Sequence, residues 1–321
     1  MIAVVHLLWE PLGPTPLRRF LASYRAHPAG ADHELIMLFN GVSDDGLRAL
    51  NSELEGVEHR RLVLAKPLQD LAAYAVAAER LQHERLCFLN SHSTLIAPDW
   101  LAKLADALDQ PLVGLVGATG SWASLRSAAL NALFLPNPYR GVFPERKLAR
   151  KLYREMELER AEGWQPPPTL ARRSPVSALT AVLQGLAPMP KQIRHFEGFP
   201  TPHLRTNGFM VRRATLTDLR IGDIRTKMDA YGLESGRENL TYRVGRSGLR
   251  AIVVARDGSR HGHENWPQSH TFWQADQEEL LIADNQTRLY ANGGLERRRL
   301  LSAYAWGRQA DPNPLTNGAA R

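Results

Sequence analysis

This chain has little cysteine and no long apolar runs. Its 321 residues include one cysteine, Cys87, which excludes an internal disulfide framework and a cysteine-rich zinc module. The longest apolar runs are too short to cross a bilayer, and no basic stretch followed by a long apolar segment opens the chain. We therefore expect a cytoplasmic protein in a reducing environment, with peripheral contact at the inner membrane face as its closest approach to a membrane.

The charge balance is basic, with 40 Lys and Arg residues against 33 Asp and Glu residues and a formal net charge of +7. Such an excess suits acidic ligands, and the phosphate of a small molecule would use it locally. Aromatic residues do not alternate with the basic ones as a stacking platform requires, so nucleic acid is not an expected partner. The length suits one large α/β domain or two ordinary ones.

Apolar runs alternate with helix-like segments over the first 120 residues. The predicted strands are Ile2–Leu8, Leu35–Phe39, Val57–Leu64, Leu86–Leu89 and Leu112–Val116. The predicted helices between them cover residues 17–24, 43–50, 68–81 and 99–108, the second with Ser43 as its N-cap. Strands that are apolar throughout and separated by helices predict a mostly parallel sheet with helices on both faces. Ligands bind such sheets at the carboxyl ends of the strands, so the residues that follow each strand are the candidates for function.

The rest of the chain is less regular. Residues 121–202 look like a helical insertion, with helices expected at Glu145–Ala161 and Ser177–Leu186. A strand at Gly208–Val211, a helix at Glu238–Ser247, a strand at Leu249–Ala255 and a helical run around Gln277–Leu289 follow. We therefore predict one domain over residues 1–256, with the insertion at about 121–202, and a C-terminal cap or tail over 257–321.

Four segments carry the chemistry, and their order along the chain is informative. They are Glu34–Gly41, Leu86–Ser93 with Ala97–Leu101, Thr206–Arg213, and Glu234–Leu240 with Arg243 and Gly248-Leu249. Together they resemble the motifs of family 2-like glycosyltransferases with the GT-A fold, over roughly residues 1–256. The resemblance implies a GT-A-like α/β fold with a mostly parallel, mixed sheet. It also implies a nucleotide-sugar donor and a carbohydrate acceptor.

The chain departs from the family where the fourth strand ends. The family has Asp-x-Asp there, which supplies oxygen ligands to Mg²⁺ or Mn²⁺, whereas this chain has Asn90-Ser91-His92. An amide and an imidazole make a poor Mg²⁺ site, although Mn²⁺ accepts nitrogen better. Three interpretations stay open. In the first, basic side chains rather than a metal neutralise the diphosphate that the nucleotide-sugar donor releases. In the second, His92 binds a metal together with a distant histidine, and in the third the site is catalytically inactive. The candidate cations are Arg205, Arg237, Arg243 and Lys227, and the candidate distant ligands are His261 and His263.

An acceptor hydroxyl must lose its proton, which calls for a carboxylate within hydrogen-bond reach. Glu234 is the first candidate, because Leu-Glu-Ser-Gly places it on a tight turn before a helix, facing the crevice. Glu238 is the alternative base, or else a first-turn glutamate that stabilises the following helix. Arg237 lies between them, and its planar guanidinium suits bidentate contact with phosphate.

Donor and acceptor contacts are expected beside these groups. The candidate donor-binding residues are His6, Asn40, Asp70, Asn90, His92 and Arg205, with Trp9 and Asp44 next to them. Packing is the alternative role for His6 and Trp9, and helix capping for Asp70. The acceptor side is expected at Thr206, Asn207, Gly208 and Phe209, together with the insertion. Gly114–Gly120 is a weak match to a dinucleotide fingerprint and otherwise suggests a backbone loop near the ligand.

The resemblance therefore implies an inverting transfer of a sugar from a nucleotide donor to a carbohydrate hydroxyl, in bacterial cell-surface polysaccharide synthesis. The alternative is a catalytically degenerate protein of the same fold that binds nucleotide or glycan without transfer. A nucleotidyltransferase would need a Gly-rich loop with a basic residue after the first strand, and Pro11–Pro14 fits that poorly.

Overall fold

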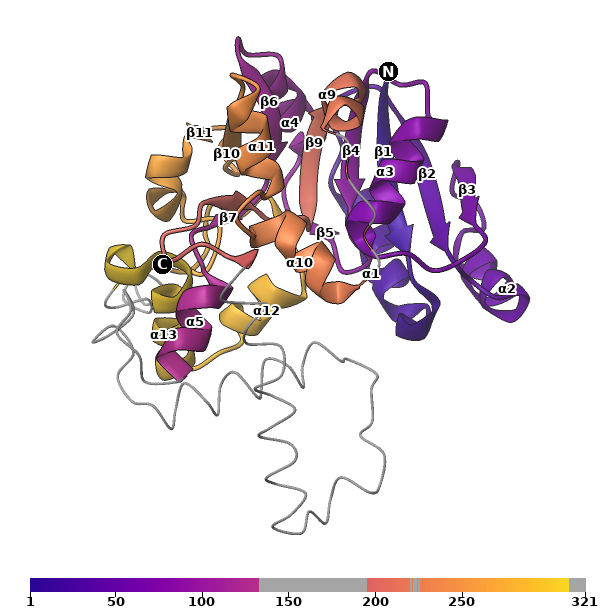
Figure 1. Cartoon of the computed structure of the whole chain (residues 1–321). Coiled ribbons are helices and arrows are strands. Elements are labelled where there is room, and N and C mark those ends of the chain that lie inside the picture. Colours follow the sequence, from indigo (N-terminus) through magenta and orange to yellow (C-terminus); the bar gives the residue numbers. More distant parts are fainter. Residues whose placement is uncertain (133–194, 220, 222–223, 225, 312–321) are drawn as a thin grey trace, which may run out of the picture.

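The structure is a computed structural model of the chain, and it describes residues 1–132, 195–219, 221, 224 and 226–311. Its centre is an eight-stranded sheet with the order β11-β10-β6-β9-β4-β1-β2-β3 (Figure 1). The strands are β1 (Ile2–Leu8), β2 (His33–Asn40), β3 (Arg60–Leu64), β4 (Arg85–Leu89), β6 (Val113–Gly117), β9 (Gly208–Arg212), β10 (Arg250–Val254) and β11 (Arg260–His261). The predicted strands of the first 120 residues, and those near 208 and 250, are confirmed.

The sheet is mixed. The pairs β1–β2, β1–β4, β2–β3 and β6–β10 are parallel, whereas β9 runs antiparallel to both β4 and β6, and β11 runs antiparallel to β10. Because β9 runs the other way, its first residues lie beside the last residues of β4, and Gly208 pairs with Leu89. The segment before β9 therefore meets the segment after β4 at one edge of the sheet.

Helices cover both faces. Along β1 the side chains alternate, so Ala3 and Val5 belong to one buried cluster and Ile2 and Val4 to another. The first cluster includes residues of α3 (Asp70–Arg80), α9 (Arg213–Asp218), α10 (Lys227–Ser235) and α11 (Leu240–Arg246). The second includes residues of α1 (Thr15–Ala26), α2 (Asp44–Glu53) and α4 (Trp100–Leu108). The predicted α/β class, with a mostly parallel mixed sheet and helices on both faces, is confirmed.

The C-terminal residues pack against the rest of the protein. Besides β11, they contribute β12 (Ile282–Ala283), which pairs with β5 (Thr94–Leu95). A second small sheet joins β7 (Gly120–Ser121) to β8 (His203–Leu204). The described residues also form the helices α5 (Leu125–Ala132), α12 (Asn285–Ala291), α13 (Leu295–Trp306) and the 3₁₀ turns Glu10–Leu12, His263–Ser269 and Gly307–Gln309. Figure 1 shows α10 and α12 at the edge where the parallel strands end.

Three local expectations are corrected. The helical run expected around Gln277–Leu289 is broken, because β12 comes first and the helix starts at Asn285, after the N-cap Asp284. Gly114 and Gly117 lie within β6 rather than in a ligand loop. Glycine is needed at both positions because leucine side chains of neighbouring segments occupy the space that a Cβ would take. Glu234 lies in the last turn of α10 rather than on a turn before a helix.

The helices expected at 145–161 and 177–186 lie outside the described residues. None of the helices in the described ranges is both long and apolar enough to cross a membrane.

Candidate functional site

The loop after β4 is fixed by its own side chains. Asn90 Oδ1 accepts a hydrogen bond from the backbone N–H of His92 at 2.9 Å and lies 3.1 Å from Ser93 Oγ. The Ser91 hydroxyl donates to the carbonyl of Leu7 at the end of β1, at 2.9 Å. An Asx turn of this kind explains why Asn stands at the strand end. It also means that the amide oxygen of Asn90 stabilises its own loop.

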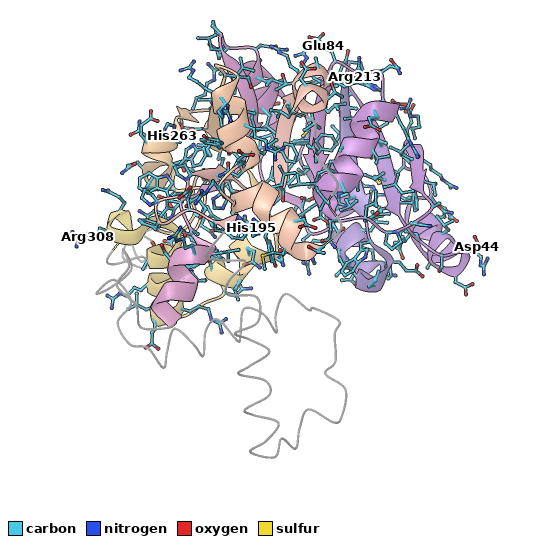
Figure 2. All side chains as sticks on the ribbon, viewed as in Figure 1. Asp44, Glu84, His195, Arg213, His263 and Arg308 are labelled. Atoms are coloured by element: carbon cyan, nitrogen blue, oxygen red, sulfur yellow. The ribbon has the colours of Figure 1, made fainter. Side chains whose placement is uncertain are left out.

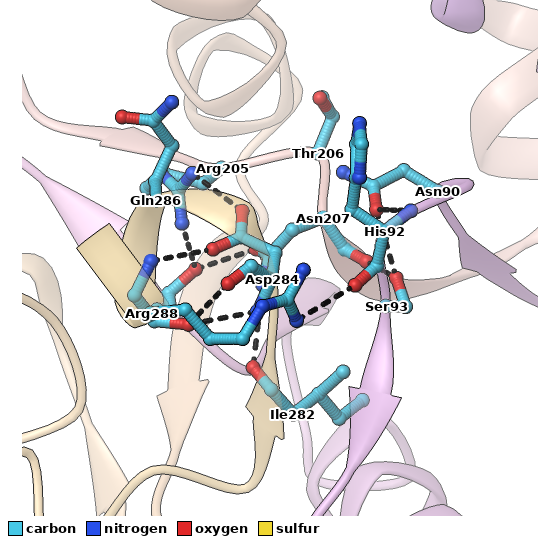
Figure 3. Close-up of polar contacts among 12 residues, drawn as sticks. Asn90, His92, Ser93, Arg205, Thr206, Asn207, Ile282, Asp284, Gln286 and Arg288 are labelled. Atoms are coloured by element: carbon cyan, nitrogen blue, oxygen red, sulfur yellow. Dashed lines mark hydrogen bonds and ion pairs between the residues drawn. The ribbon is translucent and has the colours of Figure 1, made fainter. Parts of the chain in front are cut away.

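The start of β9 lies against that loop (Figure 3). The backbone N–H of Asn90 donates to the carbonyl of Asn207 at 3.3 Å, and the Ser93 hydroxyl donates to the same carbonyl. The buried Asn207 side chain accepts from the Thr119 hydroxyl at 2.6 Å and donates to the Ile282 carbonyl at 3.3 Å. Asn207 therefore joins the loop after β4, the loop after β6 and β12.

Glu234 reaches this edge from α10. Its Oε1 accepts from both the backbone N–H of Thr206, at 3.2 Å, and the Thr206 hydroxyl, at 3.1 Å. Since Thr206 adjoins Asn207, the candidate base lies beside the segment that contacts Asn90. The structure thus brings together the loop after β4, the segment before β9 and Glu234.

Arg205 is held on three sides. Its guanidinium pairs with Asp284 at 2.7 Å, lies 4.1 Å from the centre of the Phe272 ring, and contacts the Thr119 hydroxyl at 3.4 Å. Burial alone would raise the pKa of Asp284, but the Arg205 charge and the hydrogen bonds it accepts outweigh burial and leave that pKa below its usual value. The sequence did not assign Asp284 to the site. Its only signal was the capping pattern of Asp284 with Thr287, which announces a helix and says nothing about Arg205.

Two further residues of this edge were missed. Arg288 on α12 donates to the carbonyl of His92 at 3.3 Å and to the Thr94 hydroxyl at 3.2 Å. The buried His203 on β8 has its Nδ1 2.7 Å from the carbonyl of Thr201. Burial lowers the pKa of His203, while the Glu234 charge acts to raise this pKa and the Arg205 charge to lower it. Neither belongs to a local motif, so only the folded chain shows their place.

The donor-side candidates are placed differently from one another. His6 is fully buried and stacked on Phe20, with ring centroids 3.8 Å apart. The Asn40 amide exchanges two 2.8 Å hydrogen bonds with the backbone of Leu68, so it fixes that loop. Asp70 is exposed at the first turn of α3. These contacts favour a packing role for His6 and a loop-fixing role for Asn40. Both side chains are buried, so neither offers an exposed face to a nucleotide.

A small hollow lies where β1 ends. The Trp9 side chain at its rim is 45% exposed. Its lining is mostly apolar and consists of Leu7, Leu8, Trp9, Leu12, Gly13, Pro16, Leu17, Leu50 and Ser91. Because Ser91 belongs to the loop after β4, this hollow adjoins the strand-end site.

Of the remaining candidates, one is packed in the core and two are exposed. Phe209 is 1% exposed and packs against Tyr74 and Phe88, which removes its ring from contact with an acceptor. Arg237 and Glu238 are exposed, and Arg237 pairs with Glu197 at 2.6 Å.

Two of the cations proposed for the diphosphate are accounted for differently. The Arg243 guanidinium donates to the backbone carbonyls of Glu238 at 2.9 Å and Leu219 at 3.5 Å. The side chain of Lys227 is outside the described residues.

The histidines proposed as metal ligands are not brought together. His261 lies on β11, four strands from β4, which corresponds to roughly 19 Å across a sheet. His263 is exposed on the β11 side of the molecule (Figure 2) and lies 3.4 Å from Glu264. Among the described residues, no group of three or more His, Cys, Asp or Glu side chains could hold a metal ion. The donor set after β4 therefore does not fit a divalent metal.

Comparisons with known proteins give weak likenesses. No protein-family model matches the chain, and no curated protein matches it. Among solved structures, a mannosyltransferase from Pyrobaculum calidifontis in complex with GDP-Man and Mn²⁺ matches with 18% identity and a TM-score of 0.30, over 41% of this chain and 40% of that chain. S. aureus TarS (residues 1–349) in complex with UDP-GlcNAc matches with 13% identity and a TM-score of 0.29, over 36% and 33%.

A nucleotidyl-transferring enzyme is also similar. A CMP:2-keto-3-deoxy-manno-octonic acid synthetase complexed with CTP matches with 11% identity and a TM-score of 0.38, over 78% of this chain and 87% of that chain. The match spans well under half of the two glycosyltransferase chains. TM-scores this low do not establish a shared activity.

Proposed function

We propose that this protein is a glycosyltransferase that moves a sugar from a nucleotide-sugar donor to a hydroxyl of a carbohydrate acceptor, with inversion. The observation that supports it most is the placement of Glu234. Its carboxylate lies at the carboxyl edge of the parallel strands, bonded to Thr206, beside the loop of Asn90 and His92. This edge is where open α/β sheets bind their ligands.

The chemistry needs a base and a way to accept charge on the leaving diphosphate. In this proposal the acceptor hydroxyl attacks the anomeric carbon of the donor while Glu234 takes its proton, and the bond to the diphosphate breaks. Thr206 fixes one carboxylate oxygen, and in this proposal the other oxygen takes the proton of the acceptor hydroxyl. Since the residues after β4 do not fit a divalent metal, Arg205 and Arg288 supply the positive charge of this edge.

The base is tested by Glu234→Gln with Glu238→Gln as the matched control. A glutamine still accepts the Thr206 hydrogen bonds through its amide oxygen, so the fold is kept while the base is removed. We expect kcat to fall by about 10²–10⁴-fold for Glu234→Gln, with donor binding within a few fold, and to stay near wild type for the exposed Glu238→Gln. Full activity in Glu234→Gln with loss in Glu238→Gln would reverse the assignment.

A specific observation keeps the second candidate, a degenerate protein that binds nucleotide or glycan without transfer. Asn90 Oδ1 is used by its own loop, and no cluster of three or more His, Cys, Asp or Glu side chains in the described ranges could hold a metal ion. Nucleotide sugars screened by thermal shift and by turnover, with Mn²⁺, with Mg²⁺ and with chelator, separate the two. Binding without turnover under every condition favours the degenerate protein, whereas turnover that survives chelator supports the metal-independent transferase.

A further inference from the structure

A buried ion pair connects the C-terminal part of the chain to the strand-end site. The Asp284 side chain is 1% exposed and the Arg205 side chain 12%, and their charged atoms are 2.7 Å apart. Asp284 is also the N-cap of α12, since its Oδ1 accepts from the backbone N–H of Thr287 at 2.8 Å and its own N–H donates to the Thr287 hydroxyl at 2.7 Å. The start of α12 therefore fixes the carboxylate, and the carboxylate fixes Arg205.

Arg205 in turn holds the backbone of the segment before β9. Its N–H donates to the carbonyl of Thr119 at 3.1 Å, while its guanidinium lies over Phe272 and against the Thr119 hydroxyl. The next residue, Thr206, gives both of its hydrogen bonds to Glu234 Oε1. Figure 3 shows Asp284 and Arg205 on one side of this segment and the Asn90–His92 loop on the other.

A guanidinium in this position needs its partner. An unpaired buried charge is strongly unfavourable, so without the Asp284 carboxylate the Arg205 side chain would move toward water. Arg205 and Thr206 share a peptide bond, and such a movement displaces the N–H and hydroxyl that hold Glu234. The carboxylate of Glu234 would then lose its fixed direction.

We propose that Asp284 is a positioning residue that acts through Arg205 and Thr206 to orient the Glu234 carboxylate, so that the C-terminal segment completes the site. The inference rests on the proposed function for its effect on turnover. Its structural part, the coupling of Asp284 to Thr206, stands apart from the reaction.

The test is Asp284→Asn, with Asp276→Asn as the matched control. Asp276 pairs with Arg298 at 2.6 Å in the same C-terminal segment, whereas Asp284 pairs with Arg205. Hydrogen exchange of the Thr206 amide reports the coupling directly. We expect this amide to exchange at least about tenfold faster in Asp284→Asn than in Asp276→Asn, and kcat to fall at least about tenfold with donor KM within about threefold.

A second variant tests whether the effect runs through Arg205. Arg205→Met with Asp284→Asn leaves no unpaired buried charge to draw residue 205 toward water, so we expect its Tm to recover relative to Asp284→Asn and its Thr206 amide to exchange within about threefold of wild type. Exchange of the Thr206 amide as fast in the double variant as in Asp284→Asn would overturn the proposal, as would Asp284→Asn behaving like Asp276→Asn. If wild type turns over no nucleotide sugar, the proposed function fails, while the amide exchange still decides the positioning role.

Discussion

His6 gives the sharpest test of how this core responds to pH. The imidazole is 0% exposed, stacks on Phe20 with an interplanar angle of 7°, and within the described part of the chain neither ring nitrogen has a hydrogen-bond partner. Burial, with a smaller effect from His92, lowers the pKa of His6 to about 3. Between that value and its ordinary value near 6.5, the unfolded chain binds a proton that the folded chain does not. The contribution of neutral His6 to the free energy of unfolding is therefore fully present above pH 6.5 and is lost as the pH falls toward 3.

The size of the effect follows from these two pKa values. Linkage predicts that His6 costs about 2 kcal/mol of unfolding free energy between about pH 7.5 and pH 5. Urea unfolding of wild type and of His6→Phe over this range measures it. His6→Phe keeps a flat ring against Phe20 and removes the titration, so its stability curve should be flatter by that amount.

Three other histidines, His83, His203 and His261, also have pKa values lowered mainly by burial, so only the difference between the two proteins isolates His6. Phe20→Leu is the control. It removes the stacking partner but keeps the imidazole, so the free energy of unfolding should fall by an amount that does not depend on pH. Parallel curves for wild type and His6→Phe would refute a neutral buried imidazole at this position.

Two further predictions concern the stability of local structure, one at a packed glycine and one at a helix N-cap. Gly120→Ala would place a Cβ 2.5 Å from the Trp266 ring, and we expect unfolding in urea to show a loss of about 1–3 kcal/mol. Gly245→Ala, where nothing lies within 4 Å, serves as its control and should show no loss. Ser43→Ala removes the α2 N-cap and a 2.5 Å hydrogen bond to Glu10, so thermal unfolding should report a loss of about 1 kcal/mol. A Ser43→Ala protein with wild-type Tm would contradict the capping role.

Much of the fold could be predicted from the sequence because its signals are local. Apolar runs such as Ile2–Leu8 mark buried strands, and Ser43 before two aspartates marks a helix start, so both were predicted and confirmed. The helical run around Gln277–Leu289 was wrong because short strand β12 is stabilised by pairing with β5, nearly two hundred residues earlier in the chain. A local sequence pattern contains no information about a strand partner so far away in the chain.

The candidate site shows the same division. Asn90 was proposed because it follows a buried strand, and Glu234 because Leu-Glu-Ser-Gly stands before a predicted helix. Asp284, by contrast, meets Arg205 across 79 residues of sequence, and no spacing rule connects them.

The sequence by itself determined the alternation of strands and helices, and with it the edge at which polar residues gather, because apolar periodicity and helix capping are set within a few residues of the chain. Only the tertiary structure decided what each polar side chain does there. Glu234 is held by Thr206, while the amides of Asn40 and Asn90 serve neighbouring backbone and His6 is sealed in the core. The physical reason is that a side chain's use depends on the partners within about 3 Å of it, and folding alone brings those partners together.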